Sequence, residues 1–195
     1  FTPNALRAFW HAKPTQAESY RQLVERGVLD EQRGPQLLGV YLSCAAGYAD
    51  LPPGAADAGE GVFRALLDCR VVLRTLRSLA DLIGVSSADQ LHDVQLEYDP
   101  IARELKAIPV SPTVAEMVAW AEQREREIYS QLDTIVGVSG TTVPSQVRFE
   151  AILWLQSVRF VQNGRPVAPQ RLLMIDDIQK LRRSQRSLLI DELVV

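Results

Sequence analysis

The sequence predicts a helix-rich α/β protein built around a parallel β-sheet. Two apolar runs, 37–44 and 172–175, carry no charged residue and have the length of strands, which is typical of strands buried on both faces. Long amphipathic patterns lie between the two runs. Strands separated by helices favour a layered α/β architecture with parallel strands. With 195 residues, the chain has ample length to bury a hydrophobic core.

The first predicted elements are a short helix and the first strand. Thr15 and Glu18 have the spacing of a capping box, which predicts a helix that begins there and ends before Gly27. The strand over 37–44 follows. The stretch 48–59 is rich in Pro, Gly and Ala and is predicted to be a loop.

Two long helices come next. From Glu60 to Ile83, apolar residues recur at three- and four-residue spacing, which predicts an amphipathic helix. The second long helix is predicted to begin at Ser111-Pro112, with Ser as the N-cap and Pro at the first helical position. Glu116, three residues after Thr113, supports the same helix start. Gly137 is predicted to end the helix.

Shorter elements complete the prediction. They are strands at 94–98 and 105–110, a helix at 149–158 and a helix at 184–193. The β-branched residues around Phe160 leave a strand open there as an alternative. Asn163-Gly164 is predicted to break the chain before the strand at 172–175.

The composition excludes several classes of protein. A net charge of −3 predicts no strong attraction of the whole chain to nucleic acid. No apolar run reaches the roughly 18 residues that span a bilayer, and no signal peptide is recognisable, so we expect no membrane contact and a cytoplasmic location. Cys44 and Cys69 are predicted to be buried thiols, and neither they nor His11 and His92 have the spacing of zinc ligands.

The most informative stretch is 171–180, RLLMIDDIQK, in which four apolar residues run into Asp176 and Asp177. A magnesium ion that holds nucleotide phosphates needs a hard oxygen ligand at a rigid position, and the carboxyl edge of a parallel sheet supplies such positions. A neighbouring carboxylate can orient or deprotonate an attacking water. The structural alternative is a strand that ends at an acidic turn, with one aspartate capping the next helix.

This stretch resembles the Walker B motif of P-loop ATPases, in the branch that carries a second acidic residue. Ile175–Leu181 is especially similar to the Walker B region of bacterial replication-initiator ATPases and related AAA+ proteins, and the pattern over 181–193 resembles the helix that follows in that superfamily. The resemblance implies that Asp176 is the magnesium-associated carboxylate and that Asp177 positions the hydrolytic water. It also implies ATP as the ligand and Mg²⁺ as the cofactor.

The resemblance further implies a parallel sheet core of the P-loop NTPase type with a helical insertion. In that arrangement 45–165 is the insertion, and 166–195 holds the Walker B strand and the following helix. No Walker A sequence, G-x-x-x-x-G-K-[ST], occurs in the chain, and the nearest stretch, 137–142, has no lysine. We therefore expect 1–195 to be one partial domain of a larger ATPase, inactive by itself, with other domains or subunits as partners.

A small basic cluster follows the acidic pair. It consists of Lys180, Arg182, Arg183 and Arg186. Such a cluster can contact the phosphates of DNA or nucleotide, or it can be a solvated helix face. The alternative function is a non-catalytic, helix-rich interaction or scaffold module, a degenerate ATPase. The ATPase hypothesis fails if Asp176 does not end a strand that lies beside 37–44.

Overall fold

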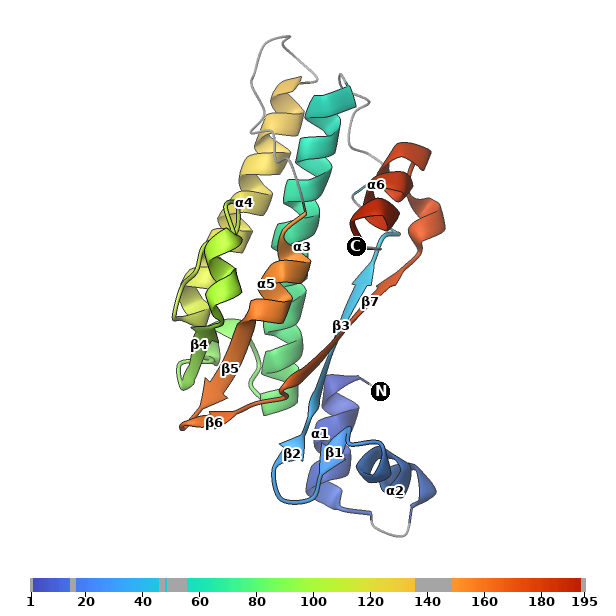
Figure 1. Ribbon diagram of the computed structural model, residues 1–195, viewed down its shortest axis with the longest axis vertical. Helices are drawn as coiled ribbons and strands as arrows, with labels where there is room; N and C mark the ends of the chain where they lie inside the picture. Colours follow the sequence, from blue (N-terminus) through green and yellow to red (C-terminus); the bar gives the residue numbers. More distant parts are fainter. Residues whose placement is uncertain (1, 15–16, 46–47, 49–55, 136–148, 194–195) are drawn as a thin grey trace.

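A computed structural model describes residues 2–14, 17–45, 48, 56–135 and 149–193 (Figure 1). The α-helices of these residues are α1 (Pro3–Ala12), α2 (Glu18–Glu25), α3 (Ala56–Ile83), α4 (Val114–Ile135), α5 (Ala151–Ser157) and α6 (Arg183–Leu193). The strands are β1 (Leu29–Asp30), β2 (Gly34–Pro35), β3 (Leu37–Ser43), β4 (Val94–Tyr98), β5 (Val158–Gln162), β6 (Arg165–Pro166) and β7 (Gln170–Asp176). Short 3₁₀ helices are η1 (Ala88–Gln90), η2 (Pro100–Glu104) and η3 (Ile178–Lys180).

The described strands form three small sheets. Strands β3 and β7 pair in parallel over seven residues, from Leu37 opposite Gln170 to Ser43 opposite Asp176. Strands β4, β5 and β6 form an antiparallel sheet, and β1 and β2 form a short hairpin. The predicted mixed α/β class with a parallel strand pair is therefore confirmed.

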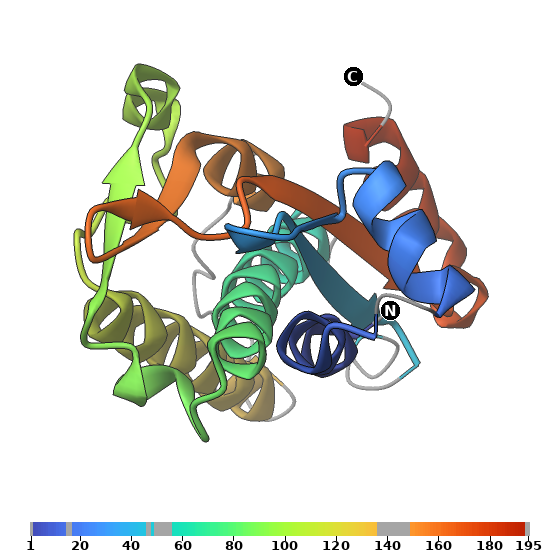
Figure 2. The same cartoon turned by 90° about the horizontal axis from the view of Figure 1, so that it is seen from below.

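Helix α3 is the centre of the hydrophobic core. Figures 1 and 2 show it between the parallel pair on one side and α4 and α5 on the other, with α1 beside its C-terminal half. Its side chains are buried around most of its circumference, as in Phe63, Leu66, Val72 and Leu79. A helix that is apolar on most faces is a core helix, so α3 serves as the support on which β3 lies.

The start of α3 differs from the prediction. The helix begins at Ala56, so residues 56–59 are helical although the sequence predicts a loop through 59. The earlier part of that predicted loop, 49–55, lies outside the described residues. The end of the helix agrees with the prediction, because Gly84 follows Ile83 with a positive φ of 92°.

The predicted strand at 105–110 is wrong. The backbone N–H groups of Lys106, Ala107 and Ile108 all donate to the carboxylate of Glu150, at N···O distances of 2.8, 2.8 and 3.2 Å. Three successive N–H groups that converge on one carboxylate form a compact turn, whereas the residues of a strand point alternately to opposite sides. The neighbouring prediction at 94–98 is confirmed by β4.

The second long helix, α4, begins at Val114, two residues after the predicted first helical position, Pro112. Thr113 caps it, because the Thr113 hydroxyl accepts the N–H of Glu116 at 3.3 Å. The hydroxyl of Ser111 instead donates to the carboxylate of Glu116. The predicted end at Gly137 lies outside the described residues.

The first short helix, α2, begins at Glu18 with Ala17 as its N-cap, and Ala17 has no side chain that can cap it. The predicted capping box depends on Thr15, which lies outside the described residues. The helix nevertheless ends before Gly27, as predicted.

The C-terminal third contains both alternatives that the sequence leaves open. Helix α5 continues directly into β5, so the region around Phe160 is a strand that follows a helix. Asn163 and Gly164 have φ values of 51° and 73°, as in the two-residue type I′ turns that join antiparallel strands. This turn joins β5 to β6. Helix α6 begins one residue before the predicted start at 184.

The chain between the two parallel strands holds elements of both kinds. The span 45–165 contains α3, α4 and α5 together with β4 and β5. Its assignment as a separate helical insertion stays a prediction. No helix among the described residues is long and apolar enough to cross a membrane.

Candidate functional site

The acidic pair lies at the carboxyl end of the parallel strand pair. Asp176 is the last residue of β7 and is paired with Ser43, the last residue of β3. Asp177 follows directly. The sequence-based condition for the ATPase hypothesis, that Asp176 ends a strand beside 37–44, is therefore met.

The backbone of Asp176 faces β3, and its side chain lies on the open face of the sheet. The Cys44 N–H donates to the Asp176 carbonyl at 2.9 Å, which continues the parallel ladder past β3. The hydroxyl of Tyr41, on the same face, donates to Oδ2 of Asp176 at 2.8 Å. A tyrosine two residues before the end of β3 thus holds the first carboxylate in place.

The carboxyl group of Asp176 is exposed and has a lowered pKa. The main cause is the hydrogen bond from the Tyr41 hydroxyl, and the second is the N–H of Asp177, which donates to Oδ1 at 2.7 Å. The same carboxylate raises the pKa of Tyr41. Asp176 is therefore ionised at neutral pH, and its oxygens are the kind of hard, charged ligand that Mg²⁺ prefers.

Asp177 ends the strand in a left-handed conformation, with φ 57° and ψ 27°. Aspartate tolerates the left-handed region better than most residues, and this conformation turns the chain from β7 into η3. The Ser43 hydroxyl donates to Oδ2 of Asp177 at 2.8 Å, and Nε2 of Gln179 donates to Oδ1 at 3.3 Å. Asp177 is the N-cap residue of η3, but its side chain makes no capping hydrogen bond. The acidic turn of the structural alternative is thus present, whereas the side-chain cap that it included is not formed by Asp177.

Tyr41 and Ser43 are the site residues that sequence reasoning missed. Both lie on β3, and each contacts one of the two carboxylates. Tyr41 and Ser43 are two residues apart on a strand, so they lie on the same face, and this can be seen in the sequence. The pairing register that places them opposite Met174 and Asp176 cannot be seen in the sequence.

Arg70 connects Tyr48, which follows β3, with the two long helices α3 and α4. The guanidinium of Arg70 on α3 lies 4.4 Å from the ring centroid of Tyr48, and its Nε donates to Glu125 on α4 at 2.9 Å. Arg70 also donates to the hydroxyl of Tyr129. These contacts hold Tyr48 against the two long helices.

The basic cluster lies just beyond the acidic pair, at η3 and the first turns of α6. Lys180, Arg182 and Arg183 are exposed and Arg186 is half-buried. None of the four has an ion-pair partner within 4.0 Å among the described residues. The start of α6 is fixed by a buried glutamine, Gln185, which accepts the N–H of Arg182 at 3.0 Å and donates to the carbonyl of Tyr48 at 2.8 Å.

The donor set at the acidic pair fits a weakly held magnesium ion. In the part of the chain that the structure describes, no three or more His, Cys, Asp or Glu side chains are grouped so that they can hold a metal. A magnesium ion at Asp176 would therefore take its other ligands from water and phosphate oxygens, as Mg²⁺ commonly does in nucleotide sites. The stretch nearest to a Walker A sequence, 137–142, lies outside the described residues.

Comparison with protein-family models, curated proteins and solved structures found no match for this chain. The fold and the site together define a mixed α/β protein with two adjacent carboxylates at the carboxyl end of a parallel strand pair. Any finer assignment depends on the geometry of that site and on the Walker B resemblance.

Proposed function

We propose that this chain is the Walker B part of a P-loop ATPase, which binds and hydrolyses ATP with Mg²⁺ to drive conformational change in a larger assembly. One observation carries the proposal: Asp176 and Asp177 lie at the carboxyl end of β7, which is parallel to β3 and paired with it. In open α/β sheets, ligands bind outside the carboxyl ends of the strands.

In this proposal the two carboxylates have different roles. Asp176, which is exposed and ionised, holds Mg²⁺ directly or through water. Asp177 orients the water that attacks the terminal phosphate, with Ser43 restraining its carboxylate at 2.8 Å. A bound magnesium ion would neutralise part of the negative charge of the phosphates.

The open face of the parallel pair supports a larger sheet. Tyr41, Leu172 and Met174 share this face and are 50%, 46% and 38% exposed. Parallel sheets occur almost only with both faces covered. Within the described residues β7 pairs only with β3, so its other edge is open to a further strand. These features favour a pair that lies inside a larger α/β domain.

The phosphate-binding loop belongs to another segment in this proposal. No Walker A sequence occurs in the 195 residues, and a lysine and a ring of backbone N–H groups are needed to hold the phosphates. These residues alone are therefore proposed not to hydrolyse ATP. Other domains or subunits complete the site, and the basic cluster of Lys180, Arg182, Arg183 and Arg186 is proposed to contact phosphates of DNA or nucleotide.

The test is the magnesium dependence of nucleotide binding by the full-length gene product. A fluorescent ATP analogue is titrated with and without Mg²⁺, using the wild type, Asp176→Asn and the control Asp93→Asn, which changes an exposed aspartate on another element. We expect Asp176→Asn to weaken the magnesium-dependent part of binding about tenfold, the scale of one charge-assisted contact, and the control to bind like wild type. Equal binding by all three proteins contradicts the assignment of Asp176. Absence of nucleotide binding favours the scaffold alternative.

A further inference from the structure

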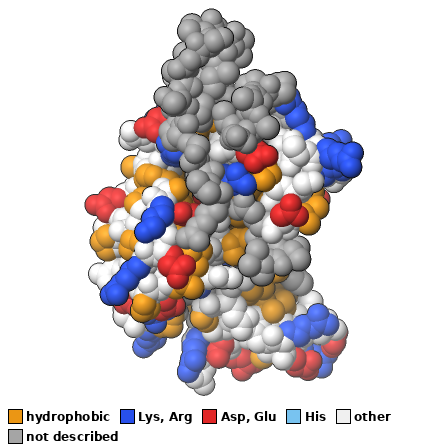
Figure 3. Space-filling view, turned by 45° about the horizontal axis from the view of Figure 1, so that its top comes forward, with side chains coloured by type: hydrophobic (Ala, Val, Ile, Leu, Met, Phe, Trp, Pro, Cys, Tyr) orange, Lys and Arg blue, Asp and Glu red, His pale blue; other side chains and the backbone are white. Residues whose placement is uncertain are grey.

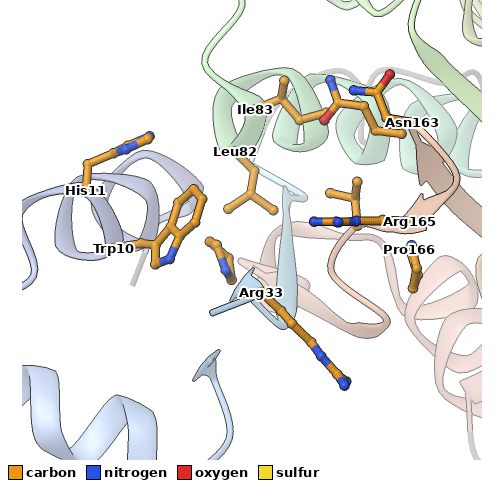
Figure 4. Close-up of a pocket in the computed structure, with 11 residues that line it drawn as sticks. Trp10, His11, Arg33, Leu82, Ile83, Asn163, Arg165 and Pro166 are labelled. Carbon is orange, nitrogen blue, oxygen red and sulfur yellow. The ribbon is translucent and has the colours of Figure 1, made fainter. Parts of the chain in front are cut away.

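A concave site lies at the opposite end of the parallel pair from the acidic residues. It is a groove of about 480 Å³ where the chain enters β3 and β7. Four segments far apart in the sequence line it: the end of α1, the β1–β2 hairpin, the C-terminal end of α3 and the β5–β6 hairpin (Figure 4). Its size is within the usual range for small-molecule sites.

The lining combines an apolar floor with a basic rim. Leu82, Ile83 and Val167 provide apolar surface, and the arginines of the lining are Arg33 and Arg165. Figure 4 shows the side chain of Arg33 directed away from Leu82. Among the residues that the structure describes, no Asp or Glu lines the groove. Figure 4 shows the guanidinium of Arg165 pointing across the groove. By contrast, the face of the molecule in Figure 3 carries acidic and basic side chains interspersed, so a purely basic lining is a local feature.

The positive charge of the groove is largely uncompensated. Neither Arg33 nor Arg165 has an ion-pair partner within 4.0 Å among the described residues. The N–H groups of Arg33 and Gln32 both donate to Oδ1 of Asp30 at 2.8 Å and lower the pKa of Asp30, and the charge of the Arg33 guanidinium lowers that pKa further. That carboxylate fixes the hairpin turn that presents Arg33. The type I′ turn at Asn163-Gly164 presents Arg165 in the same way.

The C-terminal ends of two helices disfavour an anion in the groove, and the hydrogen bonds that cap these ends weaken this effect. The C-termini of α1 and α3 both reach the groove, and a helix C-terminus has partial negative charge. The carbonyl of Phe9 already accepts the N–H of Lys13 at 3.0 Å. The carbonyl of Ala80 accepts the N–H groups of Gly84 and Val85 at 2.8 and 3.0 Å. These caps reduce the partial negative charge that the helix ends present to an anion beside Arg165.

We infer that this groove binds a small molecule with an oxyanion head group, a phosphate or a carboxylate, carried on an apolar or planar body. Arg165 takes the head group, since a guanidinium binds either oxyanion through paired N–H donors. Leu82, Ile83 and Val167 contact the body. The site is separate from the proposed ATP site and needs no Mg²⁺, because the groove lies at the amino ends of the strands whose carboxyl ends hold Asp176.

The experiment titrates the chain with three probes in the absence of Mg²⁺ and nucleotide: phenyl phosphate, benzoate and the neutral benzyl alcohol. Binding is followed by the NMR signal of the Trp10 indole N–H, because Trp10 lines the groove. The variants are Arg165→Gln and the control Arg126→Gln, an exposed arginine on α4 outside the groove. We expect saturable shifts with at least one anionic probe, none with benzyl alcohol, and affinity about tenfold weaker in Arg165→Gln only.

The two anionic probes distinguish the sources of the head group. Saturation by phenyl phosphate alone identifies a phosphate site, saturation by benzoate alone a carboxylate site, and saturation by both a general oxyanion site. The inference is overturned if no anionic probe gives a saturable shift up to about 10 mM, or if Arg165→Gln binds as tightly as the wild type. Unchanged indole N–H signals of Trp120 and Trp154, which do not line the groove, verify that free Arg165→Gln is folded.

Discussion

The buried carboxylate of Asp68 is expected to be one of the largest single contributors to stability. Its side chain, on α3, is 1% exposed, and Oδ1 accepts the N–H of Glu150 at 3.0 Å and that of Ala151 at 2.7 Å. These two N–H groups begin α5. Replacing Asp68 by Ala leaves both donors buried without this acceptor.

The expected cost follows from the number of lost bonds. A buried N–H donor left without its acceptor costs about 1–3 kcal/mol, so the two donors give a loss of about 2–6 kcal/mol for Asp68→Ala. Asp68→Asn keeps one acceptor oxygen and is expected to lose about half as much. Since a domain of this size is stable by about 5–15 kcal/mol, the alanine variant should be close to unfolding.

The assay is urea denaturation followed by circular dichroism at 25 °C, with the midpoint and slope fitted for each variant. Asp81→Ala is the matched control, because Asp81 is an exposed aspartate on the same helix and its loss should change the unfolding free energy by no more than about 0.5 kcal/mol. The argument is refuted if Asp68→Ala and Asp81→Ala have the same midpoint, since buried N–H donors would then tolerate the loss of their acceptor.

Three further predictions concern the backbone, a thiol and the acidic site. Gly34→Ala should destabilise by more than Gly27→Ala in denaturation, because both have positive φ but only at Gly34 would the new Cβ lie 3.1 Å from an indole ring. Burial raises the pKa of Cys44 to about 11, so at pH 8 only about one thiol in a thousand is ionised and iodoacetamide should label it only in the unfolded chain; fast labelling of the native chain contradicts this. Tyr41→Phe should raise the pKa of Asp176 in an NMR titration. Because the pKa of Asp176 is lowered on folding, the stability that this group contributes is present above about pH 4 and is lost as the pH falls through the pKa of the folded state. If the pKa of Asp176 is the same in Tyr41→Phe, the hydrogen bond from Tyr41 is not its cause.

The sequence predicted the parallel pair because the signal for it is local. The run at 37–44 has no charged residue and the run at 172–175 ends in two carboxylates, and parallel strands have this composition. The predicted burial on both faces is wrong, because Tyr41, Leu172 and Met174 are exposed on one face of the pair. The pairing register is set by contacts between residues more than 130 apart, such as Tyr41 with Asp176. No local pattern contains that information, so the hydroxyls that hold the carboxylates were not predicted.

The two wrong predictions have different causes. The segment 105–110 has the composition of a strand, but its N–H groups are turned toward Glu150, which lies more than 40 residues further along the chain. A tertiary contact therefore overrides local propensity there. At the start of α4 the choice is local: Ser111 and Thr113 are both suitable N-caps, and it is the Thr113 hydroxyl that accepts the N–H of Glu116, while the Ser111 hydroxyl donates to the Glu116 carboxylate.

The most direct test of the central claim is ATP turnover by the full-length gene product in the presence of Mg²⁺. The wild type is compared with Asp177→Asn and with Asp93→Asn as the control. If Asp177 orients the attacking water, Asp177→Asn should still bind nucleotide but hydrolyse it about 10²-fold more slowly or worse, the scale of a lost general base. Turnover by Asp177→Asn at the wild-type rate would show that the carboxylates at the end of β7 do not form a catalytic site.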